Sequence, residues 1–122
     1  MLKGLTYAPT GALLAAATTS LPELPGGHRN WDYRYSWVRD STFALWGLYT
    51  LGFDSEANNF LSFMQDRIRD GRPLQIMYGI GGEERLSEST LDHLTGYERS
   101  QPVRIGNAAF EQHQHDVWGA LL

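Results

Sequence analysis

Residues 26–41 constrain the fold of this chain most strongly, because aromatic and polar side chains alternate along them. The aromatic residues of this stretch occupy every second position, at Trp31, Tyr33, Tyr35 and Trp37. The residues between them are polar: Asp32, Arg34 and Ser36. In an extended backbone, this alternation places the four rings on one face and the polar groups on the other. Aromatic rings stack on the C–H faces of a pyranose, and nearby charged groups bind its hydroxyls. The pattern therefore indicates a sugar-binding surface.

The same residues also have a purely structural explanation. Aromatic side chains at period two most often belong to a core, and a neighbouring pair such as Arg39 and Asp40 is most often an ion pair that supports the fold. Composition alone favours this structural explanation. Further motifs are needed to decide between the two.

Those motifs come from a resemblance that spans nearly the whole chain. The stretch Arg29–Asp40 resembles the signature of the glycoside hydrolase family 15 glucoamylases, in a prokaryotic branch that also contains trehalases. Further segments fit the same family in the same order, at residues 5–11, 74–79, 91–97 and 100–109. Several ordered matches are more specific than any one of them.

The resemblance implies an all-α fold. Family 15 catalytic domains are (α/α)6 barrels, in which six inner helices are surrounded by six outer ones. By this resemblance, residues 1–122 are expected to form a partial (α/α)6 catalytic domain, truncated before the catalytic glutamates, with about four helices and long loops.

Hydrophobic periodicity predicts four helices, at about residues 10–19, 40–51, 55–70 and 107–120, and no sheet larger than one hairpin. Residues 40–51 are apolar nearly all round, so we expect this helix to be buried on both sides, with Asp40 or Ser41 as its cap and Gly52 as its end. Residues 55–70, capped by Asp54 or Ser55, carry a one-sided apolar stripe. That stripe comprises Ala57, Phe60, Leu61, Met64 and Ile68. Residues 74–80 are expected to be extended.

The resemblance also implies which residues bind substrate. Arg39 and Asp40 are expected to hold the hydroxyls of the glucose at the non-reducing end, with Tyr33 and Trp37 bordering its pocket. Arg104 is expected near that pocket, and Trp31 and Asn107 are weaker candidates. Family 15 enzymes invert the anomeric configuration with two glutamates, and both are expected C-terminal to Leu122. No catalytic residue is therefore expected within this chain.

Three functions stay open. The chain is expected to be part of a glucoamylase-like α-glucoside hydrolase that releases glucose from the non-reducing ends of maltooligosaccharides. An α,α-trehalase of the same family is the second possibility, and a non-catalytic carbohydrate-binding or remnant fragment is the third. If expressed alone, the chain is expected to self-associate through exposed apolar helix faces.

Net charge and composition exclude some classes of partner and site. The net charge of -4 argues against nucleic acid, and no apolar run has the ~18 residues of a membrane helix. The short apolar run before Ala17 is interpreted as a helix start and not an export signal. The absence of cysteine fits a cytoplasmic location and excludes disulfides and thiolate metal sites.

No cofactor is expected, and no metal. His113 and His115 would lie about 200 degrees apart on a helix, too far for one ion. The acidic residues in the second half of the chain are candidates for hydrolytic chemistry by type only, and solvated loop charges are the simpler explanation for them. They are Glu83, Glu84, Glu88, Asp92 and Glu98.

Overall fold

The computed structural model describes residues 2–69, 71 and 73–121. Within these residues the chain forms α-helices, 3-10 helices and short strands that pair only two by two. The α-helices are α1 (Val38–Thr50), α2 (Asp54–Ile68) and α3 (Asp116–Leu121). The 3-10 helices are η1 (Leu2–Leu5), η2 (Tyr97–Arg99) and η3 (Ala108–Glu111). The strands are β1 (Thr6–Tyr7), β2 (Ala12–Leu13), β3 (Ser36–Trp37), β4 (Met77–Tyr78), β5 (Ser89–Thr90) and β6 (Arg104–Ile105).

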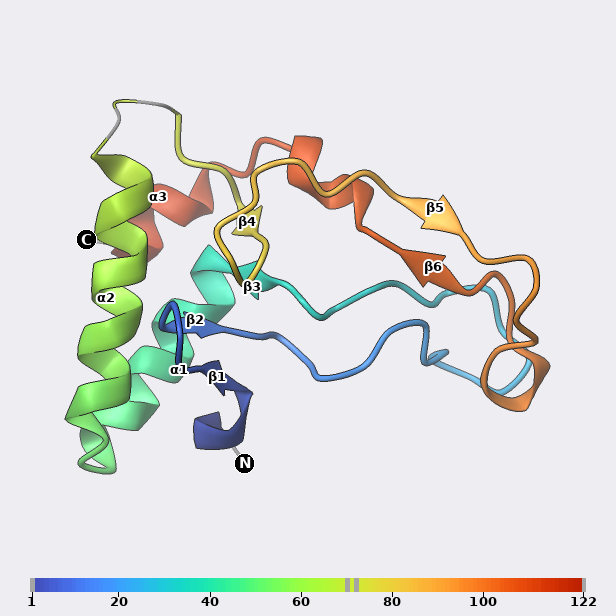
Figure 1. Cartoon of the computed structure of the whole chain (residues 1–122), viewed down its shortest axis with the longest axis horizontal. Coiled ribbons are helices and arrows are strands. Elements are labelled where there is room, and N and C mark those ends of the chain that lie inside the picture. The colour runs from blue at the N-terminus through green and yellow to red at the C-terminus, as the bar shows by residue number, and fades with distance from the viewer. Residues whose placement is uncertain (1, 70, 72, 122) are drawn as a thin grey trace.

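The α-helices gather at one end of the molecule, and long loops reach to the other (Figure 1). The β5–β6 ladder lies along those loops, whereas the β3–β4 ladder joins them to the helices (Figure 1). In the described part of the chain, no sheet has more than two strands, as predicted. None of the helices described combines the length and apolar character that crossing a bilayer requires.

Helix α1 confirms the predicted helix at 40–51, but it begins earlier and without the predicted cap. Its N-cap residue is Trp37, whose backbone is extended and whose side chain makes no capping hydrogen bond. The start is fixed instead by tertiary pairing, because β3 pairs with β4 and the Val38 N–H donates to the Ile76 carbonyl at 2.9 Å. Gly52, with a φ of 77°, follows the end of α1 as predicted.

Helix α2 confirms the predicted helix at 55–70, although residue 70 lies outside the described residues. The predicted cap at Asp54 or Ser55 is wrong, because Phe53 is the N-cap residue and makes no side-chain capping bond. The buried stripe also differs in part. It comprises Ala57, Phe60, Phe63 and Met64, whereas Leu61 and Ile68 are exposed.

The predicted helix at 10–19 is wrong. This segment forms β2 and then runs extended, because its N–H groups pair with distant carbonyls: Ala15 donates to Tyr35 at 2.9 Å and Ala16 to Tyr33 at 3.0 Å. Gly11 turns the chain with a φ of 81°, and an added Cβ there would lie 2.3 Å from the Asn59 carbonyl oxygen. Long-range hydrogen bonds thus override the helix propensity of the alanines.

The predicted helix at 107–120 is divided into η3 and α3, with an irregular segment at 112–115 between them. Asn107 does cap, as predicted, since its Oδ1 accepts from the Ala109 N–H at 3.0 Å. His113 and His115 both lie outside the helices, so the argument from helical spacing against a shared ion does not apply to them.

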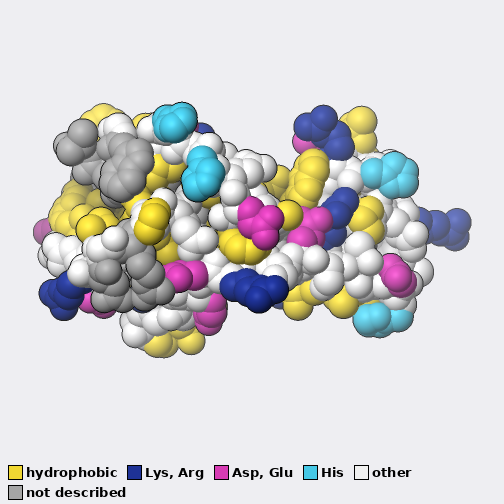
Figure 2. Space-filling view, turned by 90° about the horizontal axis from the view of Figure 1, so that it is seen from above, with side chains coloured by type: hydrophobic (Ala, Val, Ile, Leu, Met, Phe, Trp, Pro, Cys, Tyr) yellow, Lys and Arg dark blue, Asp and Glu magenta, His cyan; other side chains and the backbone are white. Residues whose placement is uncertain are grey.

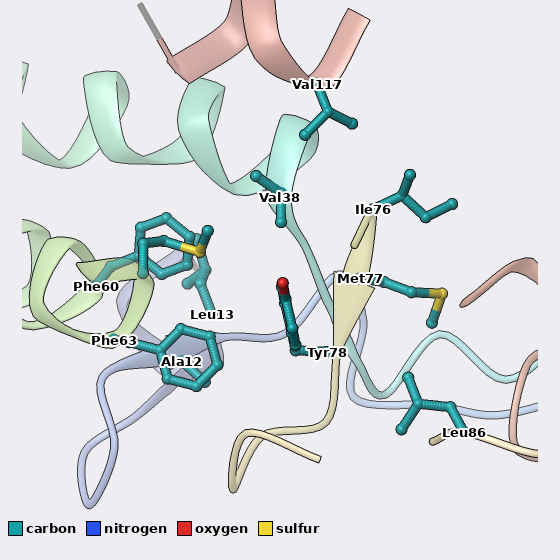
Figure 3. Packing of buried hydrophobic residues seen from close by; sticks show 11 residues of the cluster. Ala12, Leu13, Val38, Phe60, Phe63, Ile76, Met77, Tyr78, Leu86 and Val117 are labelled. Atoms are coloured by element: carbon teal, nitrogen blue, oxygen red, sulfur yellow. The ribbon is translucent and has the colours of Figure 1, made fainter. Parts of the chain in front are cut away.

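One hydrophobic core joins the helices to the ladders (Figure 3). Phe60 and Phe63 of α2 face Leu13 of β2 and Tyr78 of β4, and Val38 opens α1 above them (Figure 3). The Phe63 and Tyr78 rings meet edge to face with centroids 6.4 Å apart. This core fixes the start of α1, and with it the position of Arg39 and Asp40.

Helix α1 is covered on one side only, so the expectation of burial on both sides is wrong for this chain. Val38, Ser41 and Leu48 are buried, whereas Phe43 and Trp46 are 68% and 76% exposed. We expect other protein surface to cover this face, since an apolar helix face of this kind rarely stays open on a soluble monomer.

We expect the 122-residue chain, expressed alone, to self-associate and to bind a dye specific for apolar surface. The double variant Phe43→Ser, Trp46→Ser should reduce both, because it removes the two most exposed rings of α1. Light scattering and dye fluorescence provide the measurement, and Leu24→Ser, an exposed loop residue, is the control. A monodisperse wild-type monomer without dye binding would contradict the prediction.

Charged side chains are interspersed on the face seen in Figure 2, where Lys and Arg lie among acidic and uncharged groups without forming a basic stripe. This arrangement agrees with the net charge of -4 in giving no electrostatic footprint for nucleic acid on that face.

Candidate functional site

The aromatic stretch is extended, but its most buried residues are two of the polar ones. Asp32 and Ser36 are 0% and 1% exposed, whereas Tyr33 is 41% exposed and the other rings are half-buried. Trp31, Tyr33 and Trp37 line a common pocket, as the alternation predicts. Tyr35 departs from the prediction. It lines a separate hollow with Arg34, where its hydroxyl accepts from the Gly106 N–H at 3.1 Å.

Asp32 holds this stretch in place. Its carboxylate accepts two side-chain bonds from Arg34, at 2.9 and 2.8 Å, and a backbone bond from the Gly106 N–H at 3.3 Å. Burial alone raises the pKa of Asp32, but the hydrogen bonds and the positive charge of Arg34 outweigh burial, so the pKa lies below its usual value. Asp32 is therefore an ionised structural anchor beneath the rings.

Four of the predicted substrate-binding residues converge on one pocket. Tyr33, Trp37, Arg39 and Asp40 line it together with Ala15, and its volume is about 180 Å³. We call it the Arg39 pocket. The rings come from the extended stretch and the charges from the first turn of α1, so the β3–α1 junction brings both kinds of group to one place. Near a helix N-terminus, the Asp40 carboxylate is also favoured by the helix dipole.

Arg39 is held by two carboxylates. Its Nη1 lies 2.8 Å from Oδ2 of Asp116 on α3, and its Nη2 lies 3.6 Å from Oδ2 of Asp40. The hydrogen bond to Asp116 and the charge of Asp40 raise the pKa of Arg39, and the Arg39 hydrogen bond lowers the pKa of Asp116. Arg39 thus stays charged with its guanidinium oriented. The sequence alone gave no indication that Asp116 reaches the site.

A second pocket of about 420 Å³ is also lined by Tyr33 and Trp37. We call it the Glu88 pocket. The rings of Tyr33 and Trp37 lie with centroids 5.7 Å apart and form the wall that the two pockets share. The remaining residues of the Glu88 pocket are Trp31, Glu88, Asn107, Ala108, Ala109 and Gln112. The volume falls in the range of about 300–1,000 Å³ that is usual for small-molecule sites.

The structure does not bring Arg104 into either pocket. Its Nη1 donates to Oε1 of Glu88 at 2.6 Å, its Nε donates to the Asn30 carbonyl at 2.9 Å, and its guanidinium carbon lies 6.0 Å from the Trp31 ring centre. Arg104 therefore meets the Glu88 pocket through two of its lining residues. Asn107 does line that pocket, but its side chain is occupied by the Asp32 carbonyl and the Ala109 N–H.

Of the five acidic residues in the second half of the chain that the sequence offered as candidates, only Glu88 lines the Glu88 pocket or the Arg39 pocket, as far as the described residues extend. Glu83 instead is exposed and accepts from the Gly81 N–H at 3.0 Å. In the same part of the chain, no three His, Asp or Glu side chains gather closely enough to hold a metal ion.

Comparison with known proteins decides the family. A model of the glycosyl hydrolases family 15 matches residues 1–122. The chain belongs to glycosyl hydrolases family 15. No solved structure matches it.

Relatives of this family 15 chain carry the name trehalase. One from Mycolicibacterium smegmatis is 66% identical over 99% of the chain and 19% of its own length. A second, from Mycobacterium tuberculosis, is 64% identical over 99% of the chain and 18% of its own length. A third, from Thermoplasma acidophilum, is 46% identical over 99% of the chain and 21% of its own length. The chain thus spans about a fifth of the length of these relatives.

Proposed function

We propose that this chain is part of an α,α-trehalase and forms one wall of its glucose-binding site. In this proposal, residues 1–122 are the beginning of an (α/α)6 catalytic domain whose further helices cover the exposed face of α1. The relatives are named trehalases, which favours trehalose over the maltooligosaccharides of a glucoamylase. The cytoplasmic location stays a prediction.

The observation that carries the proposal is the convergence of Tyr33, Trp37, Arg39 and Asp40 on the Arg39 pocket. A carboxylate accepts from sugar hydroxyls, a guanidinium donates to others, and the rings cover the C–H faces. Such charge-assisted bonds hold the glucose ring in one orientation before the glycosidic bond is strained.

Chemistry requires two further carboxyl groups, which we propose lie C-terminal to Leu122. An inverting hydrolase places a general acid and a general base ~6.5–9.5 Å apart, so that water enters on the face opposite the departing sugar. In this division of roles, Arg39 and Asp40 bind and orient the glucose unit that is attacked, and Tyr33 and Trp37 exclude water from its sides.

The test is an assay of the full-length protein that carries this sequence, on trehalose, maltose and isomaltose, beside the 122-residue chain alone. We expect the full-length protein to release glucose from trehalose, with one β- and one α-glucose as first products, seen by NMR. The chain alone should release none, because it lacks the acid and base pair. Hydrolysis of maltose but not of trehalose would contradict trehalose as the substrate. Glucose release by the purified 122-residue chain would contradict the proposal that the catalytic acid and base lie outside it.

A further inference from the structure

Glu88 is placed to bind a ligand in the Glu88 pocket. Among the described residues that line this pocket, it is the only charged one. Its side chain is 19% exposed, so its carboxylate is largely withdrawn from solvent beside the aromatic wall. The aromatic rings offer apolar surface, and Gln112 adds an amide that can donate and accept.

The orientation of this carboxylate is fixed from two sides. Oε1 accepts from Arg104 at 2.6 Å, and Oε2 accepts from the Ala108 N–H at 3.3 Å. The β5–β6 ladder holds the ion pair, because Glu88 directly precedes β5 and Arg104 opens β6. A carboxylate has about four acceptor positions, and these two bonds leave about two of them for a ligand.

The chemistry of the pocket suits a neutral polyhydroxylated ring. Arg104 lies 2.6 Å from Glu88 and offsets its charge, so neither a cation nor an anion gains much from the pair. Aromatic faces beside a hydrogen-bond acceptor are instead the groups that bind a sugar. The wall shared with the Arg39 pocket places this second site directly beside the first.

We propose that the Glu88 pocket receives the second glucose unit of the disaccharide, and that Glu88 accepts hydrogen bonds from its hydroxyls. Arg104 then acts as a positioning residue, which holds Glu88 and the neighbouring Trp31 in place. This inference rests on the proposed hydrolysis of trehalose. It assigns substrate selectivity to Glu88, whereas the attacked glucose unit is held by Arg39 and Asp40.

The test compares two substrates in the full-length enzyme. Trehalose has a second sugar ring, whereas α-glucosyl fluoride has only a fluoride ion as its leaving group. We expect Glu88→Gln to lower the ratio of kcat/KM for trehalose to that for the fluoride by about tenfold or more, and Glu88→Ala to lower it further. Arg104→Lys should shift the ratio in the same direction, because a lysine cannot hold both partners as the guanidinium does.

Glu23→Gln is the matched control, because Glu23 is also ion-paired, with Arg29 at 2.9 Å, but lies in an exposed loop. It should leave the ratio unchanged. Gln112→Ala is a second test of the same pocket, because it keeps the Glu88 ion pair and can be measured even if the Glu88 variants are insoluble. We expect it to lower the ratio as well.

An unchanged ratio in soluble Glu88 and Gln112 variants would overturn the inference, as would equal losses on both substrates. These results can be distinguished from a failure of the proposed trehalase function. If the wild-type enzyme cleaves maltose and not trehalose, maltose replaces trehalose in the ratio and the role of Glu88 is still decided. If it cleaves neither disaccharide, both proposals fall.

Discussion

In the full-length enzyme, Asp40→Asn and Arg39→Lys should each lower kcat/KM for trehalose by about two orders of magnitude or more. Each lost charge-assisted bond to a sugar hydroxyl is worth roughly 1.5–3 kcal/mol, and a partner left unpaired adds to the loss. Since 1.4 kcal/mol is about a factor of ten, two such bonds account for the expected effect. Lysine keeps the charge but loses the planar fork that lets one guanidinium contact two partners.

The same variants should change stability little. The side chains of Arg39, Asp40 and Asp116 are 40%, 54% and 54% exposed, and ion pairs this exposed contribute little to stability. The structural explanation of Arg39 and Asp40 makes the opposite prediction, which is a lower melting temperature with normal activity per folded molecule. In that explanation, the Arg39–Asp116 pair is the interaction that supports the fold. Activity and melting temperature must therefore be measured on the same samples.

The measurement is steady-state kinetics and thermal unfolding of each variant beside Asp66→Asn. Asp66 is a suitable control because it is an exposed carboxylate on α2, 3.9 Å from Arg69. It should leave both quantities unchanged. Kept activity with lost stability would remove Arg39 and Asp40 from the binding site.

Local sequence pattern predicted the parts of the fold that depend on local interactions. Helix α1 is apolar nearly all round, helix α2 carries an apolar stripe, and the two helices end near Gly52 and Gly71, so their existence could be predicted. Their exact starts could not, because a strand pair and the Ile76 carbonyl determine where α1 begins.

Residues 10–19 show where local reasoning fails. Their alanines favour a helix, but their N–H groups bind the carbonyls of Tyr33 and Tyr35, which no local pattern reveals. Similarly, the predicted helix at 107–120 is interrupted after η3, where Gln75 Nε2 donates to the Phe110 carbonyl at 3.4 Å and η3 packs near β4. Such contacts form only when distant segments are already in place.

The sequence likewise predicted only those residues of the candidate site that lie in one motif. Tyr33, Trp37, Arg39 and Asp40 lie within eight residues, so a single motif places all four, and the structure gathers them in one pocket. Glu88 and Asp116 come from distant segments, and among several acidic residues nothing in the sequence distinguished them. Arg104 has the right residue type, but its bonds to Glu88 and Asn30 keep its guanidinium out of both pockets.

Asp32→Asn should lower the free energy of unfolding at pH 7 by about 1.5–3 kcal/mol, because a neutral amide replaces an ionised acceptor in a fully buried position. Arg34 is the main partner that is lost, and its side chain, at 42% exposed, can return to solvent, so the cost stays below that of an isolated buried charge. Asp92→Asn, at an exposed loop carboxylate, is the control and should change little.

The stabilisation by Asp32 should depend on pH in one direction. Folding lowers the pKa of Asp32 below its ordinary value of 3.8, so the folded state binds this proton less readily than the unfolded state does. The stabilisation is therefore present in full above the unfolded-state pKa and is lost as the pH falls through the folded-state pKa. Urea unfolding of the full-length wild-type and Asp32→Asn proteins should thus show a difference that is largest near neutral pH and shrinks below about pH 4. A difference that stays constant into the acid range would mean that the Asp32 charge does not stabilise the fold, and that the Arg34 pair is not the anchor beneath the aromatic wall.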